Sequence, residues 1–128
     1  MGITFEIEYE PFSDPLQEFS LEKTKEMYGE LFYQLRELVN KHDPVELLDL
    51  GCPVDEYESE VKTIILKLDS NMSEEQIFDL IWNEYTIWFG DPPRADRSYR
   101  FENLAKDIHK WVRDKNLKPY TDENNKQN

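Results

Sequence analysis

The sequence contains few of the residues from which metal and covalent catalytic sites are commonly built. Its single cysteine, Cys52, excludes an internal disulfide framework and a CxxC zinc or redox site. Its two histidines, His42 and His109, lie in different predicted helices, and no HExxH or Glu-x-x-His motif is present. Only four glycines occur, without a GxGxxG motif or a P-loop. We therefore expect no metal, cofactor or nucleotide site.

Long apolar runs are also missing from the sequence. The longest, such as Ile64-Ile65-Leu66, are far too short to cross a bilayer. The first residues, Met1 to Glu6, have neither a basic segment nor an apolar segment of the kind that forms a secretion signal. We expect a soluble, cytoplasmic protein that does not enter a membrane.

Basic residues are scarce relative to acidic ones. The 128 residues include 15 Lys and Arg against 28 Asp and Glu, which gives a net charge of -13 at pH 7. Because such a surface repels phosphate groups, we expect no binding to nucleic acid or to an anionic membrane. Residues 94–128 hold 9 basic and 6 acidic residues, a net charge of +3, which leaves residues 1–93 with a net charge of -16. The last helix is therefore expected to dock on an acidic body, and the remaining acidic surface to attract a basic partner.

Apolar side chains recur at helical spacing and predict an all-α or mainly α fold, a compact bundle of four to five helices. We expect a single domain over residues 1–120 and a polar, flexible tail over residues 121–128. An alternation of apolar and polar residues over 3–9 indicates a short strand or an extended arm. The predicted helices are a long one over 21–41, a two-turn helix that begins at Pro44, and three more over about 55–68, 73–89 and 98–115.

The helical spacing also predicts which side chains face the core. The inward-facing residues are expected to be Met27, Leu31, Leu35, Leu38, Ile64, Ile65, Leu68, Ile81, Tyr85, Leu104 and Ile108.

Two helix starts carry strong local signals. Asp43 precedes Pro44, with a glutamate at position 46, a pattern typical of a capping aspartate followed by proline in the first turn. Ser73 and Gln76 have the spacing of a capping box, in which each side chain binds the backbone N–H of the other. These signals predict helices beginning at Pro44 and at Glu74.

An acidic run precedes the predicted third helix. Asp55, Glu56, Glu58 and Glu60 offer oxygen ligands to a hard cation, but the simpler interpretation is that Asp55 caps the helix and the other acids favour its first turn. Tyr57 is expected to fold its ring onto the bundle and to give its hydroxyl a polar partner.

Aromatic and basic residues supply the remaining candidates. Trp82 and Trp88 belong to a concentrated aromatic stretch that is either central to the bundle or partly an interface. Arg94, Arg97 and Arg100 form a small basic patch, for which pairing with the acidic body is favoured over an anionic partner.

Residues 43–89 combine an Asp-Pro pair, a short apolar helix, a Gly-x-Pro-x-Asp-Glu-Tyr turn with a glutamate three residues after the tyrosine, and two amphipathic helices. This segment resembles the YugE-like family of small uncharacterised bacterial proteins, a domain of unknown function known from bacilli. The resemblance implies a helical fold and, because that family has no established activity, no mechanism. The matching residues are Asp43, Pro44, Gly51, Pro53, Asp55, Tyr57, Glu60, Val61, Ile64, Leu80, Ile81, Tyr85 and Phe89.

These observations favour a non-enzymatic protein–protein interaction module, of which an immunity-type protein that binds a basic partner is one concrete form. The alternative is a small metal-dependent or hydrolytic enzyme that uses the acidic cluster at 55–60. The residues predicted to contact a partner are Asp55, Glu56, Tyr57, Glu58, Trp82 and Trp88.

Overall fold

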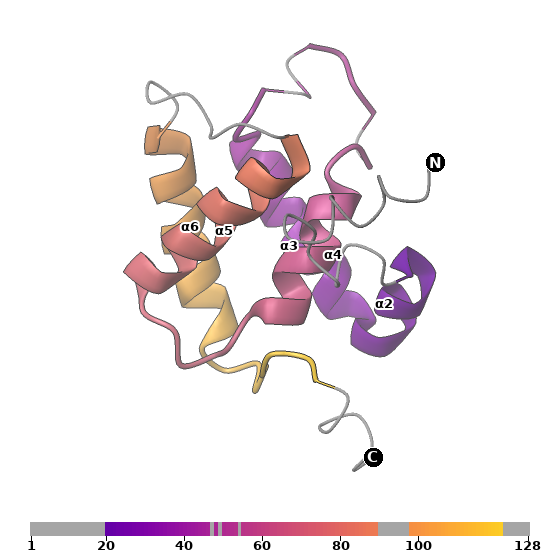
Figure 1. The fold of residues 1–128 in the computed structure, drawn as a ribbon, viewed down its shortest axis with the longest axis vertical. Helices are drawn as coiled ribbons and strands as arrows, with labels where there is room; N and C mark the ends of the chain where they lie inside the picture. Colours follow the sequence, from indigo (N-terminus) through magenta and orange to yellow (C-terminus); the bar gives the residue numbers. More distant parts are fainter. Residues whose placement is uncertain (1–19, 47, 49, 54, 90–97, 122–128) are drawn as a thin grey trace, which may run out of the picture.

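Five α-helices make up most of the part of the chain that the structure describes. This computed structural model describes residues 20–46, 48, 50–53, 55–89 and 98–121. The helices are α2 (Leu21–Tyr28), α3 (Glu30–His42), α4 (Glu58–Lys67), α5 (Glu74–Phe89) and α6 (Ser98–Val112), as Figure 1 shows. No strand occurs among these residues, so the all-α prediction is confirmed. The segment predicted as a strand, residues 3–9, and all of the predicted tail except Thr121 lie outside the described residues.

The long helix predicted over residues 21–41 is in fact two helices. Gly29 interrupts it with φ 58° and ψ -130°, a conformation that favours glycine over residues with a side chain. The Gly29 N–H still donates to the Lys25 carbonyl at 2.8 Å, which ends α2 with a helical hydrogen bond. The prediction of one continuous helix was wrong because apolar spacing carries no information about this single backbone conformation.

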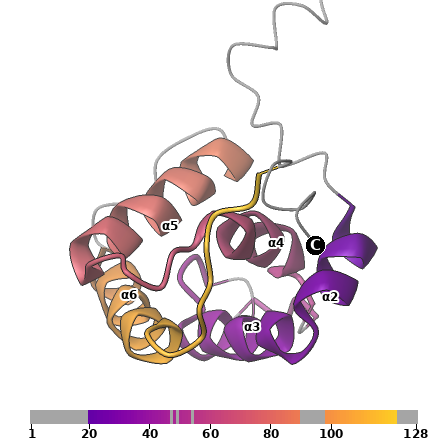
Figure 2. The same cartoon turned by 90° about the horizontal axis from the view of Figure 1, so that it is seen from below.

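Helix α4 occupies the middle of the bundle. It contacts α2, α3 and α5, while α6 packs between α3 and α5 and closes the arrangement (Figure 2). Eight of its ten residues are buried, including Lys62 and two glutamates. A helix buried on all sides is expected at the centre of a bundle rather than on its surface.

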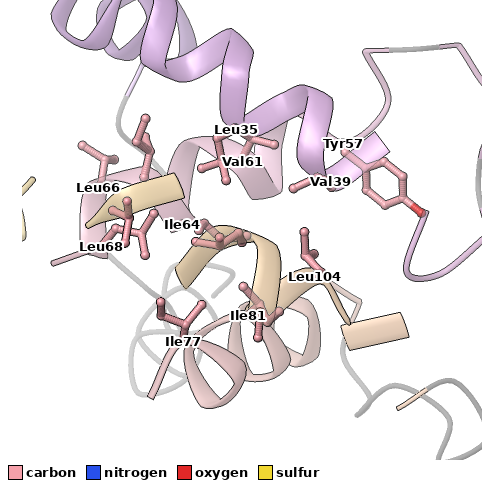
Figure 3. Close-up of a cluster of buried hydrophobic side chains, with 14 of the residues drawn as sticks. Leu35, Val39, Tyr57, Val61, Ile64, Leu66, Leu68, Ile77, Ile81 and Leu104 are labelled. Atoms are coloured by element: carbon pink, nitrogen blue, oxygen red, sulfur yellow. The ribbon is translucent and has the colours of Figure 1, made fainter. Parts of the chain in front are cut away.

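The core lies between α4 and its neighbours. Figure 3 shows Leu35 and Val39 of α3, Ile64 of α4 and Ile81 of α5 among the side chains that meet there. Of the predicted inward-facing residues, those fully buried are Leu35, Ile64, Ile65, Leu68, Ile81, Tyr85, Leu104 and Ile108. Leu31 and Leu38 pack against the core while partly exposed. Met27 is 38% exposed, so its prediction was wrong; the break at Gly29 removes the continuous helical face on which that prediction depended.

The segment between α3 and α4 is a series of turns where a short helix was predicted. Asp43 does not begin a helix: it ends α3 with φ 45° in the left-handed conformation. Described residues 44–46, 48 and 50–53 contain no helix. Helix α4 then begins at Glu58, after Tyr57, and no side chain caps it, so the expectation that Asp55 caps this helix was also wrong.

The later helix boundaries agree better with the local signals. Ser73 and Gln76 form the predicted capping box, with reciprocal hydrogen bonds of 2.9 and 3.1 Å. Helix α6 begins as predicted at Ser98 and ends at Val112, about three residues earlier than expected. The chain then returns along the end of α4, where the Tyr120 N–H donates to the Leu66 carbonyl at 2.7 Å.

Among the described residues, the ion pairs between α6 and α3 have the opposite sign from the one expected of a basic helix on an acidic body. Asp107 of α6 lies 2.7 Å from His42 Nε2 and 3.3 Å from Lys41 Nζ, both on α3. The His42 hydrogen bond, helped by Lys41, lowers the pKa of Asp107. The acid is thus on the basic segment, and the bases are on the acidic body.

Candidate functional site

The predicted acidic surface over residues 55–60 is divided between solvent and core. Asp55 and Glu56 are exposed, but Glu58 and Glu60 are only 6% and 5% exposed. The backbone reverses through residues 55–57 and enters α4, which turns the last two acids of the run inward. The expectation that these acids form one surface for a partner was therefore wrong for Glu58, and the same burial removes Glu60 from an exposed cation site.

Glu58 is held by two cations from other helices. Its carboxylate lies 2.8 Å from Lys25 Nζ of α2 and 2.7 Å from Arg36 of α3. Burial alone would raise the pKa of Glu58, but the hydrogen bonds and charges of Lys25 and Arg36 outweigh it and lower this pKa. Glu58 therefore connects three helices.

Glu60 has the opposite electrostatic environment. Burial, with a smaller contribution from the charge of Glu56, raises the pKa of Glu60 to about 7. Its Oε1 atom has no hydrogen-bond partner, and neither has the hydroxyl of the fully buried Tyr85. Burial, followed by the charge of Glu60, raises the pKa of Tyr85 well above its usual value.

Tyr57 connects the start of α4 to the end of α3. Its ring is fully buried, and its hydroxyl donates to Asp43 Oδ1 at 2.7 Å and accepts the Val45 N–H at 3.1 Å. In Figure 3 the ring lies at one end of the core, with its hydroxyl directed away from the aliphatic side chains. The predicted structural role is confirmed, and the burial leaves Tyr57 no surface to offer a partner.

The basic patch can be followed only at Arg100, because Arg94 and Arg97 lie outside the described residues. Arg100 donates to the backbone carbonyls of His42 and Asp43 at 3.3 and 2.9 Å. It thus supplies positive charge at the C-terminus of α3, where carbonyl groups lack helical partners. This contact is internal, as predicted.

The two tryptophans face different neighbours. Trp82 stacks on Phe78 at 5.5 Å between ring centroids and meets Phe101 of α6 edge to face at 5.1 Å. Trp88 donates from Nε1 to the Thr63 hydroxyl of α4 at 3.1 Å. Both are partly buried, and they do not form a common aromatic surface.

A hollow between α5 and α6 gathers acidic side chains around an aromatic ring. Its volume is about 370 Å³. The two helices lie side by side in Figures 1 and 2. We call this hollow the α5–α6 groove; it is lined by Glu74, Glu75, Phe78, Glu102 and Ala105.

The three glutamates of the α5–α6 groove form no ion pair within the part of the chain that the structure describes. Glu74, Glu75 and Glu102 are all exposed. Helix α5 contains no Lys or Arg, and Asp79 adds a further exposed acid one turn after Glu75. Lys106, four residues after Glu102 on α6, forms no ion pair with it.

The sequence did not predict this groove: it predicted only that a helix begins at Glu74, and it indicated no role for Glu75 or Glu102. The available signal was the lack of Lys and Arg throughout residues 74–89, since most exposed helix faces mix charges of both signs.

Hollows also occur elsewhere on the described surface. One, of about 320 Å³, is lined by Glu30, Tyr33, Gln34 and Glu37. Another, of about 290 Å³, is lined by Ser70, Asn71, Met72, Ser73, His109 and Arg113. Within the described ranges, no three His, Cys, Asp or Glu side chains are grouped as a metal ion would require.

Comparison of the chain with protein-family models, with curated proteins and with solved structures gives no match. The resemblance of residues 43–89 to the YugE-like family therefore stays a prediction. None of the described helices has the length and apolar character needed to cross a membrane.

Proposed function

We propose that this protein is a non-enzymatic, cytoplasmic interaction module that binds a basic protein partner through its acidic surface. The observation that carries the proposal is the α5–α6 groove, where three exposed carboxylates have no cationic partner in the described structure. Elsewhere in the molecule, acids such as Glu58 and Asp107 do have internal cations. Carboxylates without an internal cation can pair with Lys or Arg side chains of a partner.

The net charge of the chain supports the same function. At -13, the molecule attracts cationic partners from a distance and repels anionic ones, which accelerates encounter with a basic protein. An immunity-type protein that covers a basic toxin is one form of such a module. The alternative enzyme would use the cluster at 55–60, where Glu58 is already engaged by Lys25 and Arg36.

The test begins with affinity capture on the immobilised chain, followed by identification of the captured protein and measurement of its association rate. We expect a basic partner whose on-rate falls steeply as ionic strength rises. Salt ions screen the attraction between the two charged surfaces, over a distance of about 8 Å at physiological salt. Off-rates should change much less over the same range.

The control is a variant in which exposed acids remote from the groove, Glu22 and Glu26, are replaced by glutamine. It should retain binding with a modest reduction in on-rate. An acidic partner, or a basic one whose association does not depend on salt, would contradict the proposed function.

A further inference from the structure

We propose that the α5–α6 groove binds an arginine side chain of the basic partner, with the guanidinium group over Phe78 and among the carboxylates of Glu74, Glu75 and Glu102. This inference rests on the proposed function and specifies where, and through which chemical group, the partner docks.

The groove combines the two features that recognise a guanidinium group. Its lining includes three glutamates, and carboxylates accept the paired N–H donors of arginine. The lining also includes the partly exposed ring of Phe78, which is stacked on Trp82 with an interplanar angle of 25°. A planar cation stacks on such a ring, whereas an ammonium group offers only a point charge.

Phe78 and Tyr33 differ in their cationic neighbours among the described residues. Arg36 of α3 lies over Tyr33 with its Cζ atom 5.2 Å from the ring centroid, and Lys25 Nζ of α2 lies 5.7 Å from the same centroid. No cation of the described residues lies over Phe78. Among the described residues, the ring of Tyr33 thus has an arginine over it, and the ring of Phe78, beside three glutamates, has none.

The contacts of Arg36 also show what a bound arginine would gain. Its guanidinium group lies over Tyr33 and also forms a 2.7 Å hydrogen bond with Glu58. An arginine in the α5–α6 groove would make the same pair of contacts, with Phe78 as the ring and a groove glutamate as the acceptor. The three glutamates of the groove form no ion pair among the described residues, and their negative charge favours a basic partner in the groove.

The experiment titrates the full-length protein with a short glycine–arginine peptide and follows backbone amide shifts by NMR. Peptides of equal length with lysine or with uncharged citrulline in place of arginine serve as ligand controls. We expect the arginine peptide to shift the amides around Phe78 and Ala105. The lysine peptide should bind at least about threefold more weakly, because its ammonium group lacks the planar face and paired donors of a guanidinium group. The citrulline peptide should bind at least about tenfold more weakly, because it has no charge.

Two variants that each remove three negative charges, at different places on the surface, test where the peptide binds. The triple substitution E74Q/E75Q/E102Q should weaken arginine-peptide binding by about tenfold, whereas E26Q/E30Q/E37Q, on α2 and α3, should weaken it by less than about threefold. Phe78→Leu should weaken binding severalfold, and Phe89→Leu, at an exposed aromatic position near the other end of α5, should not. A circular-dichroism melt of each variant verifies that it is folded.

The outcomes separate this inference from the proposed function. Equal weakening by the two triple variants would overturn the groove as the docking site and leave the acidic interaction module standing. Equal affinity for the arginine and lysine peptides would overturn the assignment of a guanidinium group. A basic partner whose association rate depends on salt, but whose affinity for E74Q/E75Q/E102Q equals that for wild type, would likewise support the proposed function. The same result would refute the groove as the site.

Discussion

Glu58 and Glu60 lie two residues apart in the first turn of α4 and both are buried, but among the described residues cations pair with Glu58 and not with Glu60. Lys25 and Arg36 lower the pKa of Glu58 below its usual 4.5, while burial raises the pKa of Glu60 to about 7. The two carboxyls therefore contribute to stability with opposite dependence on pH. One stabilises the bundle as an anion, and the other is tolerated best as a neutral acid.

Glu58→Gln should destabilise the protein at pH 7 by about 1–3 kcal/mol, because Lys25 and Arg36 lose their shared anion. Because the folded-state pKa of Glu58 is lowered, its contribution is present above pH 4.5 and is lost as the pH falls through the folded-state value. Urea unfolding at pH 7 and at pH 4 should show a smaller difference from wild type at the lower pH. A difference that is constant or larger at pH 4 would contradict the assigned role of the charge.

Glu60→Gln should have the opposite effect. The raised pKa means that the wild-type protein has its full stability contribution from this group below pH 4.5 and loses it as the pH rises through about 7. Relative to wild type, the variant should gain about 2 kcal/mol in unfolding free energy between pH 5 and pH 8. The matched control for the loss of one negative charge is Glu102→Gln, at an exposed position on α6. Parallel stability curves for Glu60→Gln and wild type would refute a buried, unpaired carboxyl.

Tyr57→Phe should destabilise the fold by about 1–3 kcal/mol, although it keeps the buried ring. The substitution removes the hydroxyl that donates to Asp43 Oδ1 and accepts the Val45 N–H, so both of these hydrogen bonds are lost, although Asp43 Oδ1 keeps the Leu48 N–H at 3.0 Å. The control is Tyr33→Phe, at a position that is 41% exposed, where a loss below about 0.5 kcal/mol is expected. Thermal unfolding of the two variants would measure the difference, and equal melting temperatures would exclude a role for the Tyr57 hydroxyl.

The helical core could be predicted from the sequence because its signal is local. Residues such as Ile64, Ile65 and Leu68 recur with the period of a helix, and that period places them inward whichever helices they meet. The capping box of Ser73 and Gln76 is similarly a property of four consecutive residues. Both predictions were confirmed because they needed no knowledge of tertiary contacts.

The burial of the acids could not be predicted in this way. A run such as Asp55 to Glu60 is typical of a solvated helix start, and the cations that neutralise Glu58 come from α2 and α3, far earlier in the chain. Asp43 illustrates the same limit: its neighbours favour a helix start, but the hydrogen bond from Tyr57 and the contacts of Arg100 at this turn come from later elements. The α5–α6 groove likewise exists only once the two helices pack together.

Gly29 separates α2 from α3, and its backbone conformation favours glycine. Its φ of 58° with ψ of -130° is strained for a residue with a side chain, although a Cβ atom there would meet no other atom within 4 Å. If the break between α2 and α3 is kept, Gly29→Ala should therefore cost about 1–3 kcal/mol through backbone strain.

The measurement for Gly29→Ala is urea unfolding combined with far-UV circular dichroism. Loss of the break would let residues 21–42 form one straighter helix, which would move Lys25 away from Glu58 and expose part of the core around Phe32. The control is Glu26→Ala, at an exposed position within α2, which should change stability by less than about 0.5 kcal/mol. If Gly29→Ala is as stable as wild type, then the positive φ is not required and α2 does not depend on this residue for its position against α4.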